Sequence, residues 1–212
     1  MSIKAILFDL DGTLINSPEI IMQGFIGAIN EHHPSYQLTK KEITDVLGQT
    51  LIRAFDKFSN NENEYQRLVS TFRKITNELS SKMLNTYENA KNVIQYLRKK
   101  NYFVGLVTSK SREVVNDNLK SVKLENLFDV IITFEDVVNH KPHAEPLLKA
   151  LEKTNYLPEE TIYIGDHEND CIAGKNANMV TGIMGYTFRM DEVKKVNPNY
   201  IFKDLETLKK YF

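Results

Sequence analysis

Hydrophobic residues follow different periods in different parts of the chain. Residues 3–10 form a short apolar run that ends in Asp-Gly-Thr, a pattern typical of a buried strand followed by a loop. From residue 17 to residue 83 the apolar positions recur at helical spacing, with breaks at residues 33–34, at Gly48 and at residues 60–63. This stretch predicts about four helices and no strand.

The remainder of the chain alternates between short apolar runs and helical patterns. Apolar runs at residues 102–107, 128–133, 161–164 and 179–184 predict strands, and a short strand is expected at 200–202. Between these runs, apolar residues spaced i, i+3, i+4 and i+7 predict helices. Strictly alternating strands and helices favour a parallel sheet that helices cover on both faces.

These patterns predict an α/β fold, a Rossmann-like three-layer core around a parallel sheet, with a helical insert. The core is expected to consist of residues 1–16 and 84–212, and residues 17–83 are expected to form a separate small domain. A length of 212 residues is sufficient for a core and a small accessory domain.

Composition and charge narrow the classes of function. The hydrophobic fraction of 42% and the charged fraction of 26% are typical of folded globular chains. Lys and Arg number 27 and Asp and Glu 28, with no dense basic stripe, so a nucleic-acid partner is not expected. No apolar stretch approaches the ~20 residues that cross a bilayer. One cysteine, Cys171, and no leader-like N-terminal pattern predict a cytoplasmic protein without a membrane partner.

Polar side chains follow several of the predicted strands. In open α/β sheets, ligands bind outside the carboxyl ends of the strands, so these side chains are expected to share one rim. The candidates are Asp9, Asp11, Thr13, Thr108, Ser109, Lys110, Lys141, Asp166 and Asp170.

Each candidate also has a structural alternative. Asp9 and Asp11 are two residues apart, which directs both side chains to the same side of the chain, but Asp-x-Asp-Gly is also common turn chemistry. Thr108 and Ser109, which are expected to open a helix, make an anion site or cap that helix. For Asp166 and Asp170 the alternative is capping and complementation of a helix dipole.

The charges at the rim indicate a phosphate site. A carboxylate that attacks a phosphate dianion at ~4 Å meets repulsion of about 8 kcal/mol at an effective dielectric constant near 20. Asp9, Asp166 and Asp170 supply oxygen ligands suited to Mg²⁺. Lys141 supplies further positive charge, although a cation just before a predicted helix is disfavoured by ~0.3–1 kcal/mol, and a structural surface lysine is the alternative.

Four segments carry a family resemblance. D-L-D-G-T at 9–13, T-S at 108–109, K-P at 141–142 and G-D-H-E-N-D at 165–170 resemble, in order and spacing, the four motifs of haloacid dehalogenase-like phosphatases. The resemblance covers nearly the whole chain and implies that the helical block is an inserted cap domain. Within this superfamily the chain is similar to the phosphoglycolate phosphatase group and its PpaX-type pyrophosphatase branch. His143-Ala144 replaces the usual Asp-Pro after Lys-Pro.

The resemblance implies roles for the rim residues. Asp9 would attack phosphorus to form an aspartyl-phosphate, and Asp11 would protonate the leaving oxygen and then activate water. Mg²⁺ would be held by Asp9, the main-chain carbonyl of Asp11 and Asp166, and supported by Asp170 directly or through water. The phosphate-binding candidates are Thr13, Thr108, Ser109, Lys110 and Lys141.

The inserted cap is expected to select the substrate. The turn that contains Gln49, with Arg53 nearby, is the candidate contact, because an arginine there could bind a second anionic group. A position on a solvated helix face is the alternative for Arg53.

The expected activity is hydrolysis of a small-molecule phosphate by a monomer or homodimer. A phosphoryl transferase of the β-phosphoglucomutase type shares the aspartyl-phosphate intermediate and is the nearest enzyme alternative. A non-catalytic phosphoacceptor domain also groups aspartates, a hydroxyl and a lysine at a sheet edge, but its usual compact size leaves no place for residues 17–83.

Overall fold

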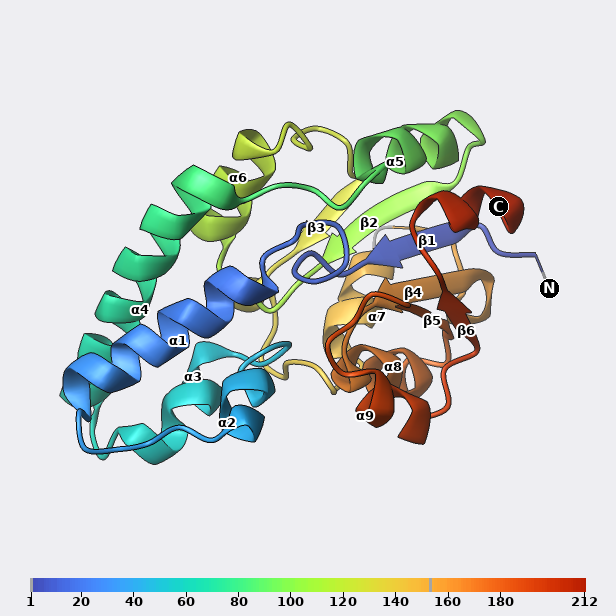
Figure 1. Ribbon diagram of the computed structural model, residues 1–212. Helices are drawn as coiled ribbons and strands as arrows, with labels where there is room; N and C mark the ends of the chain where they lie inside the picture. The colour runs from blue at the N-terminus through green and yellow to red at the C-terminus, as the bar shows by residue number, and fades with distance from the viewer. Residues whose placement is uncertain (1, 153) are drawn as a thin grey trace. The chain divides into compact units, whose positions relative to one another are not determined.

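The computed structural model describes residues 2–152 and 154–212. The chain divides into two compact units (Figure 1). We call the first the core unit; it contains the residues up to Asn16 together with Asn85–Phe212. The second, Ser17–Leu84, is called the helical unit.

The core unit is built on a parallel sheet with the strand order β3-β2-β1-β4-β5-β6. The strands are β1 (Ala5–Phe8), β2 (Phe103–Val107), β3 (Val130–Ile132), β4 (Thr161–Gly165), β5 (Val180–Met184) and β6 (Tyr200–Phe202). The strand order reverses direction between β1 and β4, which creates a topological switch point at their carboxyl ends. The predicted Rossmann-like α/β fold with a parallel sheet is confirmed.

Helices pack on the sheet of the core unit (Figure 1). They are α5 (Ala90–Lys99), α6 (Arg112–Ser121), α7 (Glu145–Leu151), α8 (Glu168–Asn176) and α9 (Met190–Lys195), with 3-10 turns at Phe134–Asp136, Pro158–Glu160 and Glu206–Lys210. Helices α7 and α8 share a buried apolar cluster with alternate strand residues such as Leu7 and Tyr163. Helix α5 contacts β2 from outside this cluster. Helices therefore cover both faces of the sheet, which keeps the central strands buried.

The strands are almost continuously apolar because both of their faces are covered. Every residue of β1 and of β4 is buried. Strand β3 is shorter than the predicted run 128–133. Just before β3, the Asp129 N–H donates to the carbonyl of Val104 at 2.8 Å and the Asp129 carboxylate accepts from the Val104 N–H at 2.8 Å, so a side chain supplies one of the two hydrogen bonds there.

The helical unit contains four α-helices, as predicted, in residues 18–83, all of which the structure describes. They are α1 (Pro18–His32), α2 (Lys40–Asp45), α3 (Leu51–Phe55) and α4 (Glu62–Met83), with a 3-10 turn at Asp56–Phe58. Helices α1 and α4 lie side by side (Figure 1). Aromatic rings fill the core, with Phe25 against Phe55 at 5.5 Å between centroids and Phe55 against Phe72 at 6.0 Å. The unit therefore has its own apolar core.

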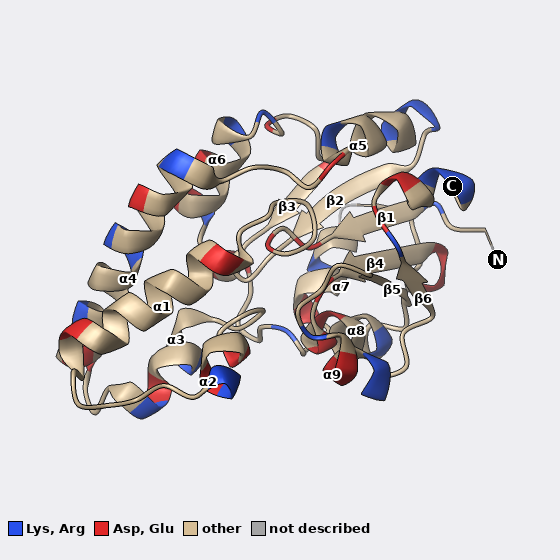
Figure 2. Cartoon of the chain, in the orientation of Figure 1, with Lys and Arg blue, Asp and Glu red and all other residues tan. Residues whose placement is uncertain are grey.

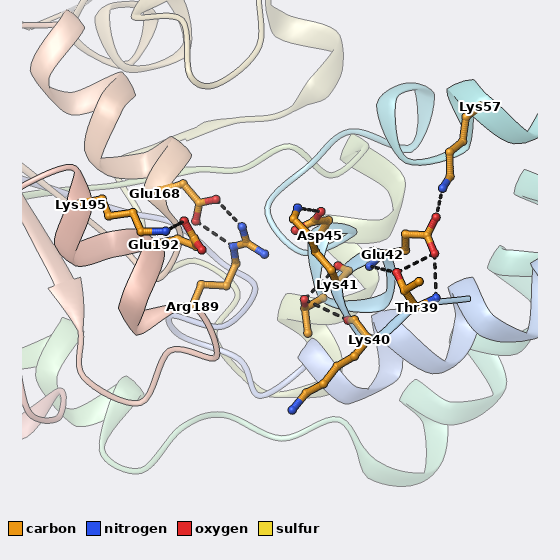
Figure 3. A network of polar contacts seen from close by, with 11 residues as sticks. Thr39, Lys40, Lys41, Glu42, Asp45, Lys57, Glu168, Arg189, Glu192 and Lys195 are labelled. Carbon is orange, nitrogen blue, oxygen red and sulfur yellow. Dashed lines mark hydrogen bonds and ion pairs between the residues drawn. The ribbon is translucent and has the colours of Figure 1, made fainter. Parts of the chain in front are cut away.

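Local polar contacts fix the ends of helices in both units (Figure 3). In the helical unit, the Glu42 carboxylate accepts a hydrogen bond from the Thr39 N–H at 2.7 Å, and the Thr39 hydroxyl accepts from the Glu42 N–H, which together form a capping box at the start of α2. The Glu42 carboxylate also contacts Lys57. In the core unit, Arg189 Nε donates to Glu168 at 2.8 Å, which connects the first turn of α8 to the residue before α9.

Acidic and basic side chains are interspersed over both units (Figure 2), in keeping with a formal charge of −1. Among the described residues, the helices are all too short or too polar to cross a membrane.

Candidate active site

The candidate residues of the core unit gather at the carboxyl ends of its central strands. Asp9 directly follows β1, Thr108 follows β2, and Asp166 follows β4. The Asp9 N–H donates to the carbonyl of Ile164 at 2.8 Å, so the ladder between β1 and β4 continues up to the candidate nucleophile. The site therefore lies at the topological switch point.

The loop after β1 turns sharply at Gly12. Its φ of +72° lies in the left-handed region, and a Cβ added there would lie 2.2 Å from Asp166 Oδ2, so only glycine fits. The Tyr186 hydroxyl donates to the carbonyl of Thr13 at 2.6 Å. These contacts fix the backbone that carries Asp9 and Asp11.

Lys141 lies at the centre of a buried group that we call the inner cluster, formed by Asp9, Lys141, Tyr163 and Asp170. Its Nζ donates to Asp9 Oδ1 at 2.9 Å, to Asp170 Oδ1 at 2.7 Å and to the Tyr163 hydroxyl at 2.9 Å. The Lys141 side chain is 2% exposed. All three donors of the ammonium are therefore used, and a structural surface role for Lys141 is wrong.

The fold itself brings the inner cluster together. Leu7 pairs with Tyr163 across β1 and β4, so Asp9, two residues after Leu7, faces the same side of the sheet as Tyr163. Asp170 comes from the first turn of α8, which packs on that side. The carbonyl of Pro142 accepts from the Asn176 side chain at 2.9 Å, which attaches the Lys141 loop to α8.

Asp170 serves both as a helix cap and as part of the site. Its Oδ2 accepts hydrogen bonds from the N–H groups of Asp166 at 3.1 Å and His167 at 3.0 Å, which forms a capping box at the start of α8. Its Oδ1 accepts from Lys141. The capping alternative and the site prediction are therefore compatible for this residue.

The expectation that Thr108 and Ser109 open a helix is wrong, which removes both the capping alternative and a helix N-terminus as the basis of an anion site there. Helix α6 begins at Arg112 with Ser111 as its N-cap residue, three residues later than expected. The Thr108 hydroxyl instead accepts from the Lys110 N–H at 3.3 Å, because a tight turn intervenes between β2 and α6. Thr108 is buried and Ser109 half-buried at the end of β2.

Burial and like charges shift the pKa values of the inner carboxyls. Desolvation, with repulsion from Asp170 and Asp11, raises the pKa of Asp9 to about 7 although Lys141 opposes the shift. Burial and the charges of Asp170 and Asp9 raise the pKa of Asp166 well above its usual range. For Asp170, burial acts in the opposite direction, but the Lys141 ammonium keeps its pKa low.

These shifts reflect a surplus of negative charge. Carboxylate oxygens of Asp9, Asp166 and Asp170 lie within 4.8 Å of one another, and Lys141 is the cation that contacts Asp9 and Asp170. Three buried oxygen donors at this spacing fit a hard divalent cation such as Mg²⁺.

A second carboxylate–lysine contact, which we call the outer pair, joins Asp11 and Lys110. Lys110 Nζ donates to Asp11 Oδ1 at 2.5 Å and to Asn118 Oδ1 at 3.2 Å. The side chains of Lys110 and Asp11 are 22% and 17% exposed. The outer pair is therefore open to solvent, whereas the inner cluster is closed.

Two buried polar atoms, Thr13 Oγ1 and His167 Nε2, have no hydrogen-bond partner among the residues that the structure describes. His167 Nδ1 accepts from the Asn169 N–H at 3.0 Å, so Nε2 carries the proton. Burial lowers the pKa of His167 and keeps the ring neutral. Thr13 is fully buried in the loop after β1, and its hydroxyl has no hydrogen-bond partner among the described residues.

Tyr163 and Asn118 are site residues that the sequence analysis missed. Tyr163 lies within an apolar strand, where the pattern predicts a core residue. It pairs with Leu7, two residues before Asp9, so its side chain lies in the same row as that of Asp9. Asn118 lies beside the apolar positions Val115 and Leu119 of α6, so a polar residue on a buried helix face was the available signal.

Gln49 and Arg53 belong to the helical unit. The Thr50 hydroxyl caps α3 by accepting from the Arg53 N–H at 3.4 Å. The Arg53 side chain is exposed and Gln49 is half-buried. Their contact with substrate stays a prediction.

A family model for haloacid dehalogenase-like hydrolases matches residues 6–184. The pyrophosphatase PpaX of Bacillus cereus (strain B4264) is 36% identical over 189 residues, which cover 89% of this chain and 86% of that protein. PpaX of Bacillus mycoides (strain KBAB4) is 34% identical over 209 residues, 98% of this chain and 96% of that protein.

Solved structures share the fold at low sequence identity. A predicted phosphoglycolate phosphatase from Haemophilus somnus superposes with a TM-score of 0.82 at 23% identity, and covers 100% of this chain and 98% of its own. A hydrolase from Pseudomonas syringae gives a TM-score of 0.86 at 22% identity, with 98% and 97% covered.

Proposed function

Because this chain belongs to the haloacid dehalogenase-like hydrolase family, we propose that it is a Mg²⁺-dependent phosphatase of small-molecule phosphates with Asp9 as its nucleophile. The observation that carries the proposal is the contact of buried Asp9 Oδ1 with Lys141 Nζ at 2.9 Å, beside two further carboxylates. A nucleophile held this way by an ammonium can approach an anionic phosphoryl group.

The donor set supports a division of labour among the three carboxylates. Both oxygens of Asp170 already accept hydrogen bonds, from Lys141 and from two backbone N–H groups. Asp9 and Asp166, with the main-chain carbonyl of Asp11, would therefore hold Mg²⁺. Asp170 would support the site through its hydrogen bonds with Lys141 and with the backbone N–H groups of Asp166 and His167. When bound, the ion supplies positive charge that offsets the repulsion between the Asp9 carboxylate and the phosphoryl oxygens.

In the first step, an Asp9 carboxylate oxygen attacks phosphorus and the bond from phosphorus to the leaving oxygen breaks. Asp11 gives its proton to that oxygen. Lys141 fixes the orientation of Asp9 through Oδ1, which leaves Oδ2 for attack. The Thr108 hydroxyl, at the end of β2, binds a phosphoryl oxygen, with Thr13 and Ser109 as the other hydroxyl candidates.

In the second step, the aspartyl-phosphate is hydrolysed. Asp11, now a carboxylate, takes a proton from water, and the resulting nucleophile attacks phosphorus to release inorganic phosphate and restore Asp9. Lys110, 2.5 Å from Asp11, keeps this carboxylate oriented through both steps.

The names of the relatives guide the choice of substrates. We propose pyrophosphate and phosphoglycolate as the first candidates, since curated relatives are named pyrophosphatases and a structural relative is named a phosphoglycolate phosphatase. The helical unit would act as a cap that selects substrate, with Gln49 and Arg53 as its candidate contacts. The enzyme would act in the cytoplasm as a monomer or homodimer.

Phosphate release with a panel of substrates tests the proposal. Wild type and Asp9→Asn would be assayed with pyrophosphate, phosphoglycolate and hexose phosphates, with Mg²⁺ or with EDTA. We expect release from one or two compounds that requires both Asp9 and the metal. Equal release by Asp9→Asn would contradict the role of Asp9, and interconversion of hexose phosphates without release would indicate a mutase.

A further inference from the structure

The outer pair contains a lysine that the two chemical steps do not consume. We propose that Lys110 is a specificity-determining residue that binds negative charge on the leaving group of the substrate. The enzyme would thereby favour phosphate esters and anhydrides whose leaving group is itself anionic. This inference rests on the proposed function, because it takes Asp11 as the residue that protonates the leaving oxygen.

The two lysines lie on different sides of the reacting phosphorus. In an in-line displacement, the nucleophile and the leaving oxygen are on opposite sides of phosphorus. Lys141 contacts the nucleophile Asp9. A general acid must come within ~3 Å of the leaving oxygen, and Lys110 Nζ is 2.5 Å from Asp11 Oδ1. The Lys110 ammonium is therefore on the leaving-group side.

Lys110 is held ready for this role. Its N–H donates to the Thr108 hydroxyl at 3.3 Å, and its carbonyl accepts from the Phe134 N–H at 2.9 Å. Among the described residues, the ammonium donates to Asp11 and to Asn118, which occupy two of its three N–H groups. One donor is left for a substrate oxygen, and the 22% exposure of the side chain makes it accessible.

The charges explain why such a cation is needed. As Asp11 gives its proton to the leaving oxygen ~3 Å away, it becomes a carboxylate, which repels the departing group if that group is anionic. Lys110 contacts Asp11 directly and offsets that repulsion. A neutral alcohol needs no such cation. The second phosphoryl group of pyrophosphate and the carboxylate of phosphoglycolate share the anionic chemistry that Lys110 would recognise.

Lys110→Gln separates charge recognition from the positioning of Asp11. Kinetic constants would be measured for pyrophosphate, phosphoglycolate and ethylene glycol monophosphate, which has a neutral leaving group. We expect kcat/KM to fall for all three substrates, because Lys110 orients Asp11. For the two anionic substrates we expect it to fall about 30-fold further, mainly through KM. Lys110→Arg should restore most of the preference, and Lys209→Gln, at an exposed pair with Glu206, is the matched control.

The two anionic substrates distinguish which anionic group of the leaving group, a phosphoryl group or a carboxylate, Lys110 binds. A selective loss with pyrophosphate alone supports a phosphoryl group as the occupant, and a selective loss with phosphoglycolate alone supports a carboxylate. An equal fall with all three substrates, or no change, overturns the inference.

A binding measurement separates this inference from the proposed function. Calorimetry would compare pyrophosphate and phosphoglycolate binding, with Mg²⁺, to Asp9→Asn and to Asp9→Asn with Lys110→Gln. We expect about 30-fold weaker binding of at least one ligand without Lys110. Equal affinities of both proteins for both ligands would overturn the inference even if wild type hydrolyses phosphates. Failure of wild type to release phosphate contradicts the proposed function instead.

Discussion

The inner cluster and the outer pair use the same two residue types in different surroundings. Lys141 is 2% exposed and contacts Asp9, Tyr163 and Asp170, whereas Lys110 is 22% exposed and contacts Asp11 and Asn118. The buried lysine is fixed by three partners, and the outer lysine keeps a donor free. Under the proposed function, the inner cluster would act on the phosphoryl group that all substrates share, and the outer pair on the leaving group that varies.

Burial makes the inner cluster costly to the fold. Removal of charges from water costs several kcal/mol per ion unless partners compensate for it. The inner cluster has one ammonium for its carboxylates, so it depends on Lys141, and a divalent cation would offset the remaining negative charge. The outer pair, partly solvated, has no such requirement.

The largest effect is expected from Lys141→Met. The change leaves Asp9 and Asp170 buried without their ammonium, so kcat/KM should fall about 10³-fold for every substrate. The free energy of unfolding should fall by about 3 kcal/mol, because one partner of a buried ion pair is lost. Substrate panels and thermal unfolding check both effects. Lys149→Met, at an exposed pair with Glu152, is the control, and a loss limited to anionic leaving groups would contradict the comparison.

The next effect is a pH-dependent loss of stability without metal. The pKa of Asp9 is raised in the folded state to about 7 from an ordinary value of 3.8, so the folded state binds more protons between these values. The free energy of unfolding should therefore fall as pH rises from about 4 to about 7, by up to ~1.4 kcal/mol per pH unit.

Magnesium ions should flatten this dependence, since a cation favours the ionised carboxylates. Thermal unfolding from pH 4 to pH 8, with EDTA or Mg²⁺, checks the effect. Asp9→Asn should show a weaker slope in EDTA. A stability that rises with pH over this range in EDTA would contradict the assignment of surplus negative charge to the inner cluster.

A smaller effect is expected from Tyr163→Phe. The hydroxyl accepts from Lys141 at 2.9 Å and donates to the carbonyl of Val107 at 3.0 Å, so its removal loosens Lys141 without removing charge. We expect kcat to fall about tenfold with little change in KM, which corresponds to the ~1.4 kcal/mol of a buried hydrogen bond. Tyr156→Phe, on the same side of the sheet, is the matched control. A change in KM for anionic substrates alone would place Tyr163 with the outer pair.

The smallest effect is expected from Asn118→Ala. Asn118 holds Lys110 through one hydrogen bond of 3.2 Å in a half-buried setting. We expect KM for pyrophosphate or phosphoglycolate to rise about threefold, and KM for ethylene glycol monophosphate to stay unchanged. Asn92→Ala, on the exposed face of α5, serves as the control. Equal changes for all three substrates would remove the distinction between the two regions at this position.

Strands and strand ends were predictable from the sequence because a parallel sheet covered on both faces requires apolar runs that end abruptly. Asp166 and Thr108 were found this way, as the first polar residues after such runs, and Asp9 as the acidic residue near the end of the run 3–10. The partners of each lysine were not predictable. Which carboxylate an ammonium reaches depends on the register between β1 and β4 and on the packing of α8, which sequence spacing does not encode.

The polar groups inside apolar patterns were the other omission. Tyr163 and Asn118 interrupt a buried strand and a buried helix face, where apolar periodicity dominates the prediction. The late start of α6 was missed because Ser111 and Thr108 are both good N-cap residues by type. The choice between them depends on a turn whose hydrogen bonds appear only in the structure.

Trapping of the covalent intermediate tests most directly that the inner cluster performs the phosphoryl transfer. Asp11→Asn would be mixed with pyrophosphate or phosphoglycolate and Mg²⁺, quenched in acid, digested and analysed by mass spectrometry. Because Asp11 is assigned to activate water in the second step, this variant should accumulate one phosphoryl group on the peptide that contains Asp9. The combined Asp9→Asn and Asp11→Asn protein should show none. Phosphorylation at a residue other than Asp9, or equal phosphorylation of the combined variant, would contradict the account.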